Sequence, residues 1–84
     1  MTQIIHDLKT WPDEFNASMF NLKSFEVRQD DRGFTTGDYL QLREWSPFSE
    51  QFTGRCLTRQ ITYILRGPKH GLPEGFVVMA VIPV

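Results

Sequence analysis

The chain has 84 residues, of which 40% are hydrophobic and 23% charged, and its formal net charge is −1. This length allows one domain, residues 1–84, and leaves no room for a second. A single cysteine excludes an internal disulfide and, with two histidines, a closed structural zinc site. No apolar run approaches the roughly 20 residues of a membrane span, and no secretory signal is visible at the start. We therefore expect a soluble, reduced, cytoplasmic domain with no cofactor, no metal and no membrane contact.

The charge is unevenly distributed along the chain. Residues 1–52 carry five basic and nine acidic side chains, giving −4, whereas residues 53–84 carry four basic side chains against Glu74 alone, giving +3. The near-neutral total argues against a global positive field that would attract nucleic acid. The asymmetry reflects either chance surface composition or a basic groove on the C-terminal strands, and the composition leaves both interpretations open.

A short strand and a helix are the first predicted elements. Residues 2–8 form the strand, and Thr10 is expected to cap a helix over residues 12–22, with Pro12 in its first turn. Asn21 tolerates a positive φ and marks the end of that helix. Three apolar residues recur at helical spacing and predict its buried face: Phe15, Met19 and Leu22.

After the helix the period changes from helical to alternating. Four strands are expected, separated by polar turns, over residues 24–28, 39–45, 55–65 and 76–84. Arg59 falls on an otherwise apolar strand face, which predicts a bulge or a local curl of the sheet away from the core. The last strand is almost continuously apolar, as is typical of a strand covered on both faces.

The order of these elements predicts the fold class. One sheet with a single helix has exposed edges and too little layering for a sandwich. Curling into a small barrel with the helix at one end removes the edges. The sequence thus predicts an α+β, mainly β fold: a small pseudo-barrel of about five to six strands with one helix after the first strand.

The leading candidate site lies where the helix is followed by the second strand. Glu26 and Arg28 share one face of that strand, next to Lys23. The spacing favours a solvated face with weak cross-strand ion pairs. It also leaves open a polar pocket, in which the carboxylate would accept from a base edge or ribose and the cations would bind phosphate.

Several other residues are weaker candidates. His6 and Lys9 lie three residues apart, and a lone histidine is more often structural than catalytic. Arg32, in a turn, is placed to reach a ligand over the barrel mouth. Trp11 and Trp45 either stack on a base or partly fill the core.

Ordered short matches to one known family run along the chain from His6 to about Met79. They comprise residues 6–9, Pro12, Phe15, 23–28, 31–32, Phe34, 37–40, 42–44, 53–55, 61–64, 71–72 and 75–78. This set resembles the DUF3850 family of small bacterial and phage proteins, a branch of the ASCH domains within the PUA-like superfamily. The resemblance implies a pseudo-barrel with a cleft beside the helix that binds RNA or a nucleotide.

The resemblance also implies the residues that would bind this ligand. Asn21 stands where the family usually has glycine, and Ser24 where threonine is commoner, which keeps the hydroxyl. The ligand-binding residues expected from the pattern and the resemblance together are His6, Lys9, Lys23, Ser24, Glu26, Arg28, Arg32, Arg55 and Tyr63.

Two other functions remain open at this point. Some ASCH relatives remove the acetyl group from an acetylated cytidine nucleoside with a lysine, a threonine and a glutamate. Lys23 matches that lysine, whereas Glu26 stands at the position of the threonine, so an enzyme would use Lys23 as acid/base with Glu26 as its partner. Alternatively, the domain is a phage-encoded module that binds a host protein. We expect a monomer in each case.

Overall fold

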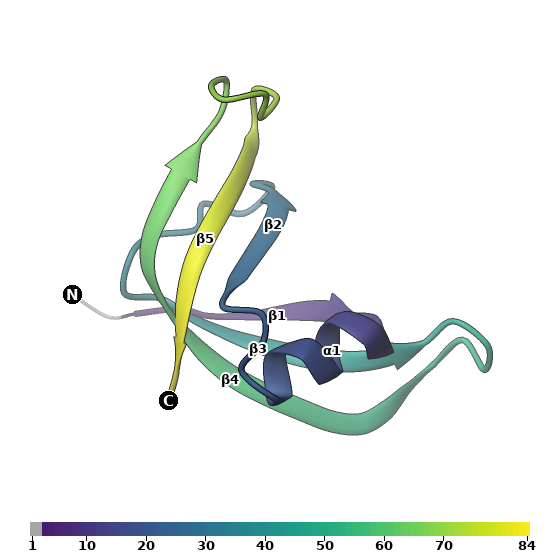
Figure 1. Ribbon diagram of the computed structural model, residues 1–84. Coiled ribbons are helices and arrows are strands. Elements are labelled where there is room, and N and C mark those ends of the chain that lie inside the picture. Colours follow the sequence, from purple (N-terminus) through teal and green to yellow (C-terminus); the bar gives the residue numbers. More distant parts are fainter. Residues whose placement is uncertain (1–2) are drawn as a thin grey trace.

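The computed structural model describes residues 3–84, which form five strands and one helix (Figure 1). In chain order the elements are β1 (Ile5–Thr10), α1 (Pro12–Met19), β2 (Phe25–Gln29), β3 (Tyr39–Ser46), β4 (Gln51–Arg66) and β5 (Phe76–Pro83). The expected order of elements is confirmed. No helix in this part of the chain is long and apolar enough to cross a bilayer.

The five strands form one curled sheet in the order β1-β3-β4-β5-β2. Strand β1 runs parallel to β3, and the other neighbours are antiparallel. The long strand β4 pairs with β3 along its first part and with β5 along its second. Figure 1 shows it curving from the half of the sheet that holds β1 and β3 to the half that holds β5 and β2. The register shifts between Ile61 and Tyr63, at this bend. The mainly β fold class is confirmed, as a half-barrel.

The core lies between the two halves of the curled sheet and under α1. Its buried members are Leu8, Phe15, Phe34, Leu40, Leu42, Ile61, Val77, Met79 and Val81. Arg59 is buried beside them, and its Nη2 atom donates to the main-chain oxygen of Ser18 at 2.9 Å. A cation at the C-terminal end of a helix is favourable. Arg59 therefore faces the interior, where it holds the end of α1. The register shift in β4 lies two to four residues further along the strand, between Ile61 and Tyr63.

The helix begins differently from the expectation. Thr10 does not cap it: Trp11 occupies the N-cap position and makes no side-chain capping bond. Thr10 instead ends β1, paired with Glu44, and its hydroxyl donates to the main-chain oxygen of Leu8. Because Thr10 pairs with β3 as the last residue of the first strand, it does not cap the helix. Thr2, which the expected strand included, lies outside the described residues.

The helix also ends earlier than expected. It stops at Met19, so Leu22 is not part of its buried face and is 82% exposed. Asn21 adopts φ 60°, which confirms that the chain turns there through the left-handed region. The main-chain N–H of Leu22 then donates to the oxygen of Ala17 at 2.8 Å, which closes the last turn.

Burial in the strands follows one face. In β5, Val77, Met79 and Val81 are buried, while the residues before and between them are only half-buried and Ile82 is exposed, so the expectation that this strand is covered on both faces is wrong. Only one side of a half-barrel encloses the core, and among residues 3–84 no second layer covers the outer side. Leu40 and Leu42 of β3 point inward as expected.

Candidate functional site

The half-barrel has an open seam between its two edge strands. No main-chain pairing joins β1 to β2 within residues 3–84. Two arginines bridge the seam instead: Arg28 Nη2 donates to the main-chain oxygen of Lys9 at 3.1 Å, and Arg32 Nη1 donates to that of Asp7 at 2.8 Å. Hydrogen bonds from these two side chains thus connect the two sides of the seam.

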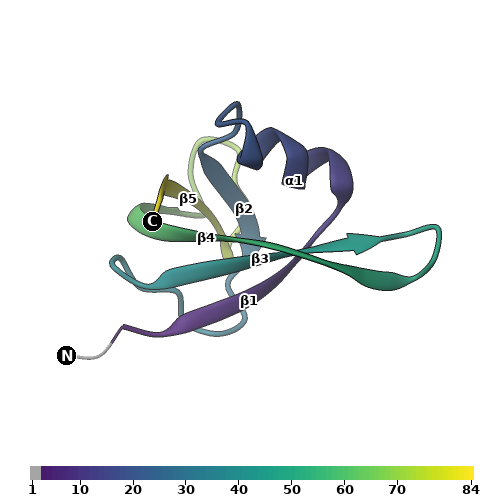
Figure 2. The ribbon, with the colours of Figure 1, turned by 90° about the horizontal axis from the view of Figure 1, so that it is seen from below.

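A cavity of about 790 Å³ occupies this seam beside the start of α1. Figure 2 shows α1 lying over the sheet between the end of β1 and the start of β2. The cavity, here called the seam pocket, is lined by Lys9, Thr10, Trp11, Glu14, Lys23, Phe25, Glu26, Val27 and Arg28. Its size falls within the roughly 300–1,000 Å³ of small-molecule sites. It is the expected cleft beside the helix, formed by the edges of two strands.

Glu26 lies at the wall of this pocket and is only 2% exposed. Its carboxylate lies 2.5 Å from Lys23 Nζ and 3.2 Å from Arg28 Nη2. The apolar neighbours Phe25 and Val27 are 44% and 49% exposed. The solvated-face interpretation of Glu26 is therefore wrong. The polar side of β2 turns inward because two cations compensate the buried charge.

This arrangement leaves unused hydrogen-bonding capacity. An ionised carboxylate accepts about four hydrogen bonds, and Glu26 accepts one from each cation. The Lys23 ammonium retains donors beyond the one directed at Glu26. The pocket can therefore accept N–H or O–H groups of a ligand at Glu26 and bind an anionic group at Lys23.

Aromatic rings continue the pocket at the end of β1. Trp11 is 55% exposed, and its ring centroid lies 6.4 Å from that of Trp45 at a tilt of 37°. The Lys9 ammonium lies 4.2 Å from the centroid of the Trp45 ring. A planar ligand group entering the pocket would meet the exposed indole of Trp11.

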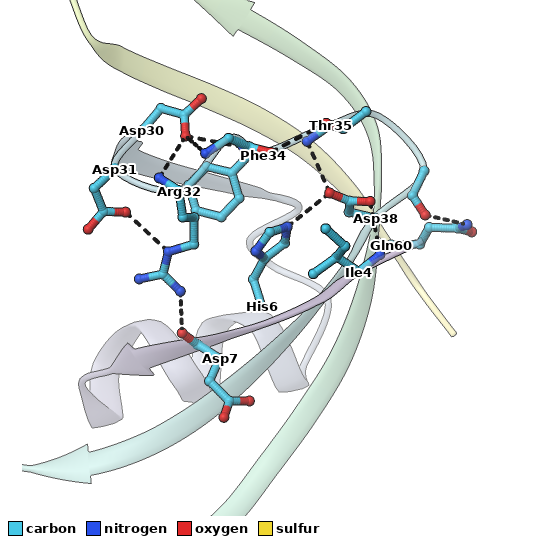
Figure 3. Close-up of polar contacts among 12 residues, drawn as sticks. Ile4, His6, Asp7, Asp30, Asp31, Arg32, Phe34, Thr35, Asp38 and Gln60 are labelled. Atoms are coloured by element: carbon cyan, nitrogen blue, oxygen red, sulfur yellow. Dashed lines mark hydrogen bonds and ion pairs between the residues drawn. The ribbon is translucent and has the colours of Figure 1, made fainter. Parts of the chain in front are cut away.

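His6 lies away from the pocket, in a buried polar cluster (Figure 3). Its Nε2 atom is 2.9 Å from Asp38 Oδ2, and its ring packs edge-on against Phe34. Burial alone would raise the pKa of Asp38, but the His6 hydrogen bond and main-chain N–H groups of Ile4 and Thr35 lower it. This pair fixes the loop before β3 to β1, which is a structural role.

The remaining expected residues are spread over the molecule. Arg32 bridges the seam at Asp7 and also pairs with Asp31, outside the pocket lining (Figure 3). Arg55 contacts Asn16 of α1 and also pairs with the buried Glu44 of β3. Ser24 and Tyr63 are exposed and do not line the seam pocket.

The C-terminal arginines do not form one basic groove. Arg55 and Arg59 reach different residues of α1, while Arg66 pairs with Asp30 and donates to the main-chain oxygen of Phe34. The excess charge of residues 53–84 is therefore divided among separate structural contacts.

The sequence interpretation missed most of the apolar and acidic lining of the pocket. Phe25, Val27 and Glu14 line it together with four of the expected side chains, Lys9, Lys23, Glu26 and Arg28. The available signal in the sequence was a glutamate flanked by a phenylalanine and a valine at the start of a strand. It is informative only once β2 is known to be an edge strand.

The fold and the site together define a small β half-barrel domain with a charged pocket in its seam. The chain belongs to the DUF3850 family, described as a domain of unknown function, whose family model matches residues 5–81. No curated protein matches the chain.

Proposed function

We propose that this domain binds a nucleotide, free or within RNA, in the seam pocket. The observation that carries the proposal is the buried Glu26 carboxylate, held by Lys23 and Arg28 at the wall of an open cavity. The resemblance to ASCH and PUA-like domains, which are thought to bind RNA or nucleotides beside their helix, supports the same ligand class.

The energetics of Glu26 support a ligand role over a purely structural one. Burying an ion pair costs desolvation energy that its attraction repays only in good geometry, and hydrophobic side chains often replace such pairs at no cost. Charged groups clustered in a cleft are a feature of functional sites. Here the cluster faces an accessible pocket, where its charges meet a ligand.

The pocket offers each part of a nucleotide a partner. The base lies against Trp11 and donates N–H groups to Glu26, since stacking on an aromatic ring combined with edge hydrogen bonds is how unpaired bases are recognised. The phosphate lies toward Lys9 and Lys23, where ammonium groups act as phosphate-binding charges. With two carboxylates and three cations around the cavity, the site favours one nucleotide and not the coating of a duplex.

Titration of the protein with nucleoside monophosphates and with a short RNA pool tests this function. We expect one bound nucleotide per chain, with an affinity that falls as salt rises. Lys23→Ala should weaken binding, and Lys69→Ala, which removes the same charge from the loop between β4 and β5, should not. Absence of binding at low salt, or recovery of a stoichiometric protein partner in place of nucleic acid, would overturn the proposal.

Hydrolysis of a modified nucleoside is a second candidate, favoured by the 2.5 Å contact between Lys23 and Glu26. In such a reaction Lys23 and Glu26 would exchange a proton with the substrate as an acid/base pair. Arg28 donates to the same carboxylate and holds it beside Lys23. Turnover of an acetylated cytidine that is abolished by Lys23→Ala would establish this activity, and a panel of modified nucleosides left unchanged would exclude it for them.

A further inference from the structure

A second group of cations and aromatic rings continues from the seam pocket over the outer face of β1, β3 and β4, opposite the core. We call this group the outer strip; it consists of Lys9, Trp11, Arg43, Trp45 and Phe52. Lys9 and Trp11 also line the seam pocket. Trp45 lies beside Trp11 and is the register partner of Phe52 on β4. The three rings therefore form one row that leads from the pocket onto the β3–β4 hairpin, which projects beyond α1 in Figure 1.

The two cations of the outer strip face each other on neighbouring strands, which is electrostatically unfavourable. Lys9 and Arg43 are register partners in the β1–β3 ladder, with both side chains on the exposed face. Like charges directly opposite one another on neighbouring strands are unfavourable. Among residues 3–84 neither side chain is in an ion pair. An anion lying between them would relieve the repulsion, and a phosphate of a strand that leaves the pocket would be such an anion.

Each cation also lies over a ring. Lys9 Nζ is 4.2 Å from the centroid of Trp45, and Arg43 Cζ is 4.2 Å from that of Phe52. Bases of unpaired strands stack on aromatic rings and on guanidinium planes. The strip thus alternates positions for phosphates with positions for bases.

A hollow of about 250 Å³ lies at the far end of the outer strip. It is lined by Gln41, Arg43, Phe52, Gly54, Arg55 and Cys56. Gly54 adopts φ 94°, within the irregular stretch of β4 where two extra residues oppose β3. This irregularity opens the hairpin beside Phe52, which leaves room for a second base or sugar.

We propose that the ligand of this domain is a single-stranded nucleic acid segment, with one nucleotide in the seam pocket and the next one or two on the outer strip. This inference rests on the proposed function of the seam pocket and extends it. Lys9 joins the two parts, because it belongs to both.

Binding of a fluorescently labelled eight-nucleotide single strand, as RNA and as DNA of the same sequence, tests the outer strip. We expect Phe52→Ala to weaken binding of the strand roughly tenfold, within the range for loss of one base–ring stack. Arg43→Glu should weaken it at least as much and should reduce the slope of log affinity against log salt by about 0.7 for each phosphate that Arg43 neutralises. Neither change should alter the affinity for a mononucleotide, since both residues lie outside the seam pocket.

Matched controls separate this effect from a change in stability or net charge. Lys69→Glu makes the same charge change as Arg43→Glu, in the loop between β4 and β5, and Phe20→Ala removes an exposed phenylalanine beyond α1. Both should bind the strand as the unchanged protein does. The RNA and DNA arms identify which sugar the domain prefers.

The outcomes distinguish the strip from the pocket. Strand binding that is unchanged in Arg43→Glu and Phe52→Ala would overturn the outer strip and leave the seam pocket standing. Equal weakening of strand and mononucleotide, or equally tight binding of a duplex, would also contradict it. If neither strand nor mononucleotide binds the unchanged protein, both proposals are wrong.

Discussion

Arg28 and Lys9 connect the two edges of the half-barrel: Nη2 of Arg28 lies 3.1 Å from the main-chain oxygen of Lys9, and the same nitrogen lies 3.2 Å from the Glu26 carboxylate. A side chain that bridges the seam therefore also holds the buried acid of the pocket. Under the proposed function, a change at this position should affect both stability and ligand binding. Arg32 bridges the seam at Asp7 without touching Glu26, and so provides a comparison.

Arg28→Ala should lower both stability and affinity. It leaves Glu26 buried with Lys23 as its remaining partner, for which we expect a loss of about 2–3 kcal/mol in the free energy of unfolding. Urea denaturation measures the stability, and nucleotide titration measures the affinity. In Arg32→Ala we expect a loss of about 1 kcal/mol and unchanged binding. Equal effects of the two changes would contradict the separate role of Arg28.

Glu26→Gln should change the selectivity among nucleotides more than the overall affinity for them. The amide keeps the shape of the side chain but replaces one accepting oxygen by a donor. It also leaves Lys23 and Arg28 without their counter-charge, so phosphate attraction persists while the hydrogen bonds to the base change. Affinities for the four nucleoside monophosphates, measured by calorimetry, should therefore become more similar than they are for the unchanged protein. A variant that keeps the original order and spacing of affinities would show that Glu26 does not contact the base.

Asp30 should contribute to stability above pH 4 and lose that contribution in acid. Burial alone would raise its pKa. The hydrogen bond from Arg66 and the N–H groups of Phe34, Gly33 and Arg32 instead lower its pKa from 3.8 to about 2. Because the folded-state pKa is the lower one, the stabilisation is complete above the unfolded value of 3.8 and disappears as the pH falls through about 2.

Comparison with Asp30→Asn isolates this contribution. We expect the variant to be less stable at pH 7 by about 1–2 kcal/mol, since charge-assisted hydrogen bonds are removed. The difference from the unchanged protein should shrink between pH 4 and pH 2 in denaturation curves taken at each pH. A constant difference across that interval would show that the charge of Asp30 is not the cause.

Arg59→Met should loosen the helix. Methionine retains apolar packing but removes the donor to the main-chain oxygen of Ser18. We expect a loss of about 1–3 kcal/mol in the free energy of unfolding, because a buried charge-assisted hydrogen bond is removed and the Ser18 oxygen keeps the N–H of Asn21 as a donor, at 3.1 Å. Hydrogen exchange of the amides in α1 should accelerate more than that of β5. Uniform acceleration throughout the sheet would argue against a specific role at the helix.

Local patterns were sufficient to predict the order of elements and part of the core. Alternation placed Leu40 and Leu42 inside, and Asn21 marked the turn after the helix. The patterns did not predict that Thr10 would extend β1, because its pairing with Glu44 is a long-range contact. For the same reason they gave no indication that the two edge strands stop short of closing the barrel.

The site was predictable in part. Lys23, Glu26 and Arg28 are brought together as the pocket interpretation requires, since they are neighbours in sequence. His6 lies outside the seam pocket, because it pairs with Asp38, which is 32 residues away in the sequence and buried. The contacts of Arg43 with Phe52 and of Lys9 with Trp45 depend on strand register, which a single sequence does not determine.

The central claim is that the seam between β1 and β2 is the binding site, and mapping amide and indole chemical shifts by NMR during a nucleotide titration tests it most directly. We expect the largest changes at the Trp11 indole and at the amides of Phe25 to Arg28, with little change at His6 and Asp38 in their separate buried cluster. Changes centred on that cluster or on the loop between β4 and β5, or no changes at saturating nucleotide, would contradict the account.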